Sequence, residues 1–149
     1  MRYVEAVNEY KGKGKSLFLA GAITNAPDWQ SEMVALLRDQ NLVVFNPRRK
    51  NFPINNKNAA LEQITWEYKY LRKADGISFW FSKETLNPIV LYELGAWSMT
   101  QKPLFIGMDP EYKRRVDVEI QTNLVRPEIH VVYDLRALSG LIRDWASAT

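Results

Sequence analysis

Short apolar runs alternate along this chain with longer segments in which apolar residues recur at helical spacing. Five runs have the length and composition of strands: 16–21, 42–45, 76–81, 103–107 and 129–133. Each run is nearly continuous in apolar residues, which is typical of parallel strands covered on both faces. The pattern therefore predicts a sheet that is buried on both sides.

Helical spacing fills the gaps between these runs. Helices are expected at about 27–39, 58–73, 88–101, 111–124 and 135–147. This alternation predicts an α/β fold in three layers, with a five-stranded, mainly parallel sheet flanked by helices. Residues 2–7 are either an added edge strand or a loose arm. The chain, residues 1–149, is expected to form a single domain.

Composition narrows the classes of function. Apolar residues make up 46% of the chain, and there is no cysteine for disulfides or thiolate metal sites. His130 is the single histidine, so neither a histidine-based metal site nor a catalytic triad is expected. The expected chemistry calls for no metal or organic cofactor. A net charge of +3 suits an anionic small molecule as well as nucleic acid. The N-terminus has no long apolar run, so neither signal peptide nor membrane span is predicted, and a cytoplasmic location is expected.

The sheet itself predicts where a ligand binds. Ligands of open parallel sheets lie beyond the carboxyl ends of the strands, where the strand order reverses. Three segments that follow expected strands carry residues suited to such a site: 20–29, 46–52 and 82–93. Candidate functional residues are therefore sought first in these segments.

The segment NPIVLYELGAW, residues 87–97, reads as an apolar helix with one exception, Glu93. Burying an ionised carboxylate is costly unless it is paired or hydrogen-bonded. Asn87 is a plausible N-cap, with Pro88 at the first helical position. Glu93 is then either exposed beside apolar neighbours that turn away, or held at the ligand edge as a nucleophile or general base.

Two further carboxylates precede the third expected strand. Glu67 lies three residues after Ile64 and four before Leu71, so it shares the apolar stripe of its helix. It either pairs with a lysine or arginine or faces a ligand. Asp75 is explained by a helix-ending turn that uses Gly76. Spacing alone puts Asp75 at the amino end of its strand, away from the ligand edge.

The loop after the first expected strand offers small and polar groups. Gly21 permits the close approach of a ligand, Thr24 is a candidate contact, and the ring of Trp29 can stack on a base. The alternative is purely structural, with Asn25 or Asp28 capping the next helix. Both interpretations stay open at the level of sequence.

The loop after the second expected strand is the longest irregular segment, residues 46–57. Loops of about this length in compact domains tend to be functional. Arg48 and Arg49 have the planar guanidinium that binds phosphate or carboxylate with two hydrogen bonds. The alternative is a solvated basic loop.

Four motifs now stand in a fixed order: LFLAGAITNAPDWQ, VFNPRR, ITWEYKYLRKADGISFWF and NPIVLYELGAW. Together they resemble the nucleoside 2-deoxyribosyltransferase-like family, in particular its branch of short single-domain proteins, over roughly residues 16–107. The resemblance implies a flavodoxin-like or Rossmann-like fold. It also implies cleavage of the N-glycosidic bond of a nucleoside or nucleotide, with the sugar passed to another base or to water.

The resemblance also implies roles for individual residues. Glu93 is the nucleophile, and Asp75 positions the substrate or supports proton transfer to the base. Asn87 stands where transferases of the family often carry an aspartate. Asparagine can hydrogen-bond a base or a sugar hydroxyl, but it cannot donate a proton as an acid. Substrate contacts are expected at Gly21, Thr24, Trp29, Arg48, Arg49 and Glu67.

Three activities remain open from sequence. The first is a nucleoside deoxyribosyltransferase or a nucleoside or nucleotide N-glycosidase. The second is a nucleotide-binding module without turnover, and the third is a glycohydrolase that cleaves NAD. The expected partner is a small molecule rather than polymeric nucleic acid or a membrane. The family further implies a homo-oligomer in which a neighbouring subunit often completes the active site.

Overall fold

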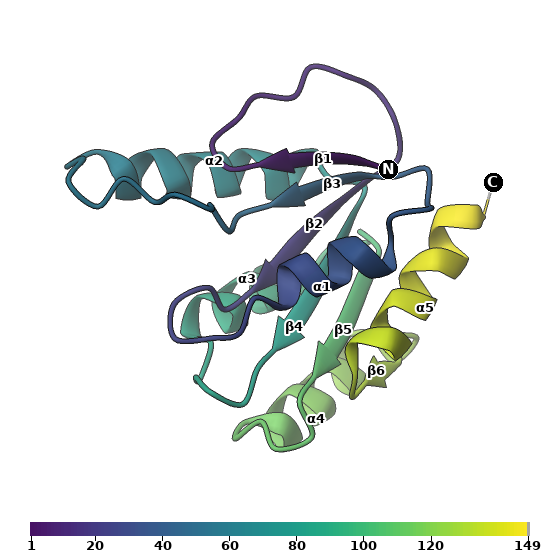
Figure 1. The fold of residues 1–149 in the computed structure, drawn as a ribbon. Coiled ribbons are helices and arrows are strands. Elements are labelled where there is room, and N and C mark those ends of the chain that lie inside the picture. The colour runs from purple at the N-terminus through teal and green to yellow at the C-terminus, as the bar shows by residue number, and fades with distance from the viewer. Residues whose placement is uncertain (149) are drawn as a thin grey trace.

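The computed structural model of the protein describes residues 1–148 and contains a six-stranded parallel sheet (Figure 1). The strands are β1 (Arg2–Glu5), β2 (Ser16–Gly21), β3 (Val43–Asn46), β4 (Gly76–Phe81), β5 (Leu104–Met108) and β6 (Val131–Val132). The predicted α/β fold is confirmed. The expected count of five strands is one too low, because β1 pairs with β3 as an edge strand.

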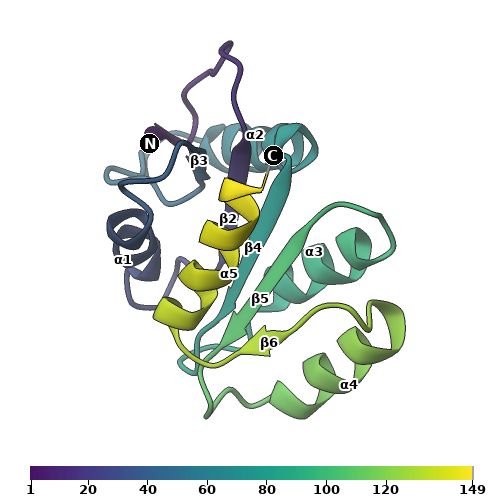
Figure 2. The ribbon, with the colours of Figure 1, turned by 90° about the vertical axis from the view of Figure 1, so that its right-hand side faces the viewer.

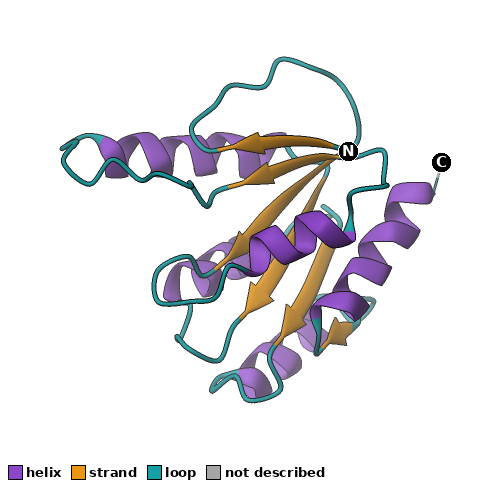
Figure 3. Ribbon diagram, in the orientation of Figure 1, coloured by secondary structure: helices purple, strands orange, loops and turns teal. Residues whose placement is uncertain are grey.

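Helices cover both faces of the sheet (Figure 3). They are α1 (Trp29–Leu36), α2 (Ala59–Lys73), α3 (Pro88–Ser98), α4 (Arg115–Val125) and α5 (Leu135–Ser147). α1 and α5 pack on one face, and α2, α3 and α4 pack on the other (Figure 2). None of these helices combines the length and apolarity that crossing a membrane requires, within residues 1–148.

Alternation along the strands divides the core into two layers. Phe18, Phe45 and Phe79 point to the side of α2 and α3, whereas Leu17 and Val44 point to the side of α1 and α5. All five side chains are almost completely excluded from solvent. This packing on both faces is what the continuous apolar runs of the strands predicted.

The strand order β1-β3-β2-β4-β5-β6 reverses between β2 and β4. The chain passes from β2 to β3 on one side, then returns across β2 to add β4 and β5 on the other. The loops after β2 and β4 therefore leave the sheet in different directions. Such a reversal opens a crevice at the carboxyl ends of the two strands, where ligands of this fold class bind.

Of the apolar stripe expected on α2, Leu61, Ile64, Tyr68 and Leu71, only Leu71 faces the core. Leu61, Ile64 and Tyr68 are 68%, 63% and 58% exposed. The buried residues of α2 are instead Ala59, Trp66, Tyr70 and Leu71. α2 is thus apolar on two sides, one of which packs on the sheet and one of which faces outward.

Candidate active site

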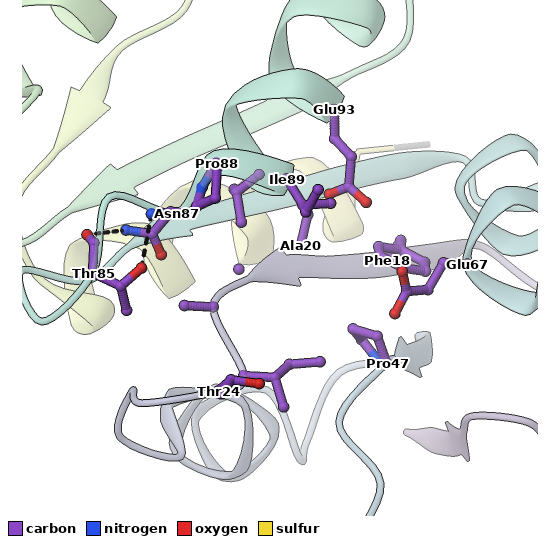
Figure 4. Close-up of a pocket in the computed structure, with 14 residues that line it drawn as sticks. Phe18, Ala20, Thr24, Pro47, Glu67, Thr85, Asn87, Pro88, Ile89 and Glu93 are labelled. Atoms are coloured by element: carbon purple, nitrogen blue, oxygen red, sulfur yellow. Dashed lines mark hydrogen bonds between the residues drawn. The ribbon is translucent and has the colours of Figure 1, made fainter. Parts of the chain in front are cut away.

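A cavity of about 260 Å³ opens at the reversal between β2 and β4 (Figure 4). The end of β2 and the following loop supply one wall, and α3 with the loop before it supplies another. Pro47 and Glu67 close the side next to β3. Glu67 and Glu93 are the charged side chains that line the cavity, and no lysine or arginine of residues 1–148 lines it.

Glu93 reaches this cavity from the second turn of α3. Val90 and Leu94 anchor the helix in the core, being 4% and 7% exposed, and so fix the direction of Glu93. Burial raises the pKa of the half-buried Glu93 carboxyl to about 8, and the negative charge of Glu67 contributes. No cation or hydrogen-bond donor opposes this rise. Glu93 is therefore largely protonated at neutral pH when no ligand is present.

Glu67 faces the same space from α2 (Figure 4). Gln63, one turn earlier, donates 2.7 Å hydrogen bonds from Nε2 to Glu67 Oε1 and to the carbonyl of Pro47. Burial raises the pKa of Glu67, and the hydrogen bond from Gln63 partly offsets the rise. No lysine or arginine pairs with Glu67 within residues 1–148, so the predicted alternative of an ion pair is wrong. Beyond the effect of burial, the negative charge of Glu67 raises the pKa of Glu93, so the two carboxyl groups titrate as a coupled pair.

Asn87 is held rigidly at the start of α3. Its backbone has a φ of 53° in the left-handed region, and its Nδ2 donates to the carbonyls of Ser82 (3.0 Å) and Thr85 (2.8 Å). Oδ1 is buried without a hydrogen-bond partner. Since both amide hydrogens are held by carbonyls, turning the amide over would set oxygen against oxygen. Asn87 thus lines the cavity as an acceptor, although it makes no side-chain cap for the helix.

Gly21 and Thr24 both line the cavity, but Trp29 does not. A Cβ on Gly21 would lie 2.3 Å from the ring of Trp29, so glycine is required for this packing. Trp29 is only 3% exposed, and its Nε1 donates to the carbonyl of Ala22. The expected stacking of Trp29 on a base is therefore incorrect. The ring supports the wall of the cavity from beneath, and Asp28 caps α1 as the structural interpretation predicted.

Arg48 is committed to the loop after β2. Its guanidinium donates to three backbone carbonyls, those of Ile23, Ala26 and Pro27. It also donates to Gln30 Oε1 at 3.0 Å and lies 3.7 Å from the Asp28 carboxylate. Neither Arg48 nor Arg49 lines the cavity that holds Glu93. Neither arginine is therefore placed to contact the phosphate of a substrate bound beside Glu93, contrary to the prediction from sequence.

Asp75 lies at the amino ends of the strands, directly before the first residue of β4, whereas the cavity that holds Glu93 lies at their carboxyl ends. Its Oδ2 accepts hydrogen bonds from the backbone N–H (2.8 Å) and the hydroxyl (2.7 Å) of Ser16. These bonds join the amino ends of β2 and β4. Asp75 is not brought together with Glu93, and the turn expected at Gly76 is absent because Gly76 begins the strand.

Gln63 is a residue of the site that sequence reasoning missed. Its spacing of four residues before Glu67 was the available signal, because side chains at that spacing meet on a helix. No cluster of three or more aspartate, glutamate or histidine side chains within residues 1–148 is placed to hold a metal ion.

A cavity at the strand reversal of a parallel α/β sheet is where folds of this class bind small ligands, and two carboxyl groups line that cavity here. The family model described as nucleoside 2-deoxyribosyltransferase-like matches residues 14–112, and the chain belongs to this family. The match includes Glu67, Asn87 and Glu93. No match to a curated protein was found. Membership supports a glycosyl-transfer function, an enzyme of the deoxyribosyltransferase type, and a nucleoside as small-molecule partner.

Proposed function

We propose that the protein cleaves the N-glycosidic bond of a nucleoside with Glu93 as nucleophile and passes the sugar to another base or to water. The observation that carries the proposal is the position of Glu93, a carboxyl group with a raised pKa in a cavity without cations. Departure of the base leaves positive charge at C1′ of the sugar. An uncompensated carboxylate stabilises that charge and then forms a glycosyl ester.

The Glu67–Glu93 pair supplies the proton that the reaction needs. When the shared proton resides on Glu67, Glu93 is ionised and ready to attack. The C1′–N bond breaks, its electron pair stays on the base nitrogen, Glu93 bonds to C1′ and Glu67 gives its proton to the base. Water or an acceptor base then attacks C1′, the ester bond breaks and Glu67 takes up the proton of the attacking group.

The charge of the cavity favours a nucleoside over a nucleotide. A substrate phosphate would meet Glu67 and Glu93 with no cation to offset the repulsion. Asn87 offers a buried acceptor, which is satisfied by a hydroxyl or N–H donor rather than by an oxyanion. A sugar hydroxyl has the required chemistry.

We further propose that a second copy of the chain covers the outer side of α2 and α3. This α2–α3 face is defined by six side chains, each more than half exposed: Leu61, Ile64, Tyr68, Ile89, Tyr92 and Met99. A standard interface takes about 800 Å² from each partner, and exposed apolar patches larger than a few hundred Å² mark interaction sites.

A groove in the α2–α3 face connects the proposed interface to the chemistry. It has a volume of about 540 Å³, and its polar lining residues are Glu67, Glu93, Arg72 and Thr100; the other lining residues are mainly apolar. Tyr92, 78% exposed beside the groove, supplies a projection that a two-fold partner can insert. The second copy would close this opening and exclude water from the carboxylates.

Incubation of the protein with nucleosides, nucleotides and NAD, with and without an acceptor base, tests the function. Base release without acceptor indicates hydrolysis, and base exchange indicates transfer. Nicotinamide release would assign the activity to NAD cleavage, and saturable binding without any product would support a module without turnover. Glu93→Gln should abolish product formation. Glu62→Gln, the same change at an exposed position of α2, is the matched control and should keep full activity.

A further inference from the structure

We propose that the protein has a second binding site, which takes a phosphate group or a similar oxyanion at the carboxyl ends of β1 and β3. A cavity of about 300 Å³ lies there. Its lining residues are Tyr3, Asp28, Ser31, Asn46, Arg48, Arg49 and Lys50. None of these residues lines the cavity that holds Glu93, so the two sites are separate. We call this second space the anion cavity.

The anion cavity carries an excess of positive charge. Arg48 and Asp28 offset each other across 3.7 Å. Both are also engaged elsewhere, Arg48 with the loop after β2 and Asp28 with Ser31 at the start of α1. Arg49 and Lys50 form no ion pair within the part of the chain that the structure describes. The lining side chains thus carry three positive charges, on Arg48, Arg49 and Lys50, against one negative charge on Asp28, and this excess favours an anionic ligand.

Arg49 has an unused donor. Its Nη1 is buried and has no hydrogen-bond partner within residues 1–148. A buried charged donor left unpaired is unfavourable, and arginine cannot relieve the cost by losing its proton. The guanidinium lies 5.4 Å from the centre of the Phe52 ring, a contact that restricts its orientation. Arg49 is thus held ready for the paired hydrogen bonds that an oxyanion accepts.

The neighbouring carboxylate of Glu5 does not pair with the side chain of Arg49 or Lys50. Glu5 Oε1 accepts a 3.3 Å hydrogen bond from the backbone N–H of Lys50 rather than from its ammonium group. Tyr3 donates its hydroxyl hydrogen to Glu5 Oε2 at 3.2 Å and accepts from Asn46 Nδ2 at 3.0 Å. These bonds fix the neutral walls of the anion cavity. The charged donors that remain for a ligand are Arg49 and Lys50.

Titration calorimetry of the full chain with inorganic phosphate, at constant ionic strength in chloride, tests the site. Saturable binding is expected, and Arg49→Gln should weaken it roughly tenfold or more because charge-assisted hydrogen bonds are lost. Lys50→Gln should weaken it as well. Lys57→Gln removes the same charge from an exposed residue outside the anion cavity and should leave the affinity unchanged. Arg49→Lys keeps the charge without the planar guanidinium and should give an intermediate affinity. This variant tests the site even where Arg49→Gln does not fold.

Two parallel titrations, with deoxyribose 5-phosphate and with a deoxynucleoside 5′-monophosphate, identify the source of the phosphate group. Equal affinities indicate free phosphate as the ligand, and tighter binding of an ester indicates a phosphorylated metabolite. The proposal is overturned if no titration saturates, or if Lys57→Gln weakens binding as much as Arg49→Gln does. It is also overturned if Glu93→Gln tightens binding, since the anion would then occupy the other cavity.

Discussion

Glu67 on α2 and Glu93 on α3 line one cavity from two sides, and burial together with the negative charge of Glu67 raises the pKa of Glu93. Neither carboxyl group has a cationic partner within residues 1–148. Two acids in this arrangement resist being ionised together, so the folded protein is less stable than it would be with neutral side chains there. Such a local cost is typical of positions kept for chemistry rather than for stability.

Glu93→Gln should therefore stabilise the protein in a pH-dependent way. The folded-state pKa of Glu93 lies above its unfolded value, so the stability that this carboxyl contributes is complete at low pH. It is lost as the pH rises through about 8. The variant should match the wild type near about pH 4 and exceed it by on the order of 3 kcal/mol near about pH 9. Urea denaturation measures this; a constant difference across pH would contradict the raised pKa.

Glu67→Gln should lower the pKa of Glu93, because it removes the nearby negative charge while leaving the burial in place. Carboxyl carbon chemical shifts followed by NMR report this pKa directly. Turnover should fall by roughly 10²-fold or more, since the proton donor for the base is lost. An unchanged pKa for Glu93 in this variant would show that the two groups do not interact.

Asn87→Ala should destabilise the protein by about 2–3 kcal/mol, because it removes two side-chain hydrogen bonds and leaves alanine in the left-handed region. Asn87→Gly should lose the same bonds without the backbone strain, and so be about 1 kcal/mol more stable than the alanine variant. Thermal or urea unfolding of the pair separates the two contributions. Identical stabilities would argue that the left-handed backbone at Asn87 carries no strain.

Arg48→Met should loosen the loop of residues 22–28, whose carbonyls Arg48 holds. The free energy of unfolding should drop by about 2–3 kcal/mol, and amide hydrogens of the loop should exchange faster. Arg38→Met alters an exposed arginine and should change stability by about 0.5 kcal/mol or less. Slow exchange in the Arg48 variant would mean that the loop is held by other contacts.

Tyr92→Asp should convert the proposed dimer into a monomer, because a charge placed in the centre of an apolar interface is not solvated there. Light scattering after gel filtration should give twice the chain mass of 17.3 kDa for the wild type and the single mass for the variant. Ile120→Asp places the same charge on an exposed isoleucine of α4, outside the α2–α3 face, and should stay dimeric. A monomeric wild type at every concentration would refute the interface.

Sequence patterns predicted the sheet and helices well because their signals are local. The strand runs of 16–21 and 76–81 and the helix of 135–147 match the structure at both ends. Residues 2–5 were ambiguous because pairing with β3, about 40 positions later, decides whether they form a strand. α4 begins at Arg115 rather than near 111, because turns occupy the preceding positions.

Predictions for the site were less complete because cavities depend on tertiary contacts. The segments that sequence placed at the carboxyl ends of the strands do contribute to one cavity. Its lining includes Glu93, Asn87, Gly21 and Thr24, together with Glu67 from α2. Trp29 and Arg48 failed as ligand contacts because each meets local backbone carbonyls, which no composition rule reveals. Periodicity predicted correctly that Leu61, Ile64 and Tyr68 share one side of a helix. It cannot distinguish a helix side that packs on the core from one that faces outward.

The edge strand β1 has a further consequence for handling the protein. Its pairing from Arg2 to Glu5 occupies the backbone groups along one side of β3. If the first residues were deleted, or drawn away by a fused tag, Val43–Asn46 would present unpaired amides and carbonyls on an apolar strand. Exposed strand edges of that kind recruit strands from other molecules. Preparations altered at the N-terminus should therefore precipitate on heating or concentration well before those with β1 intact.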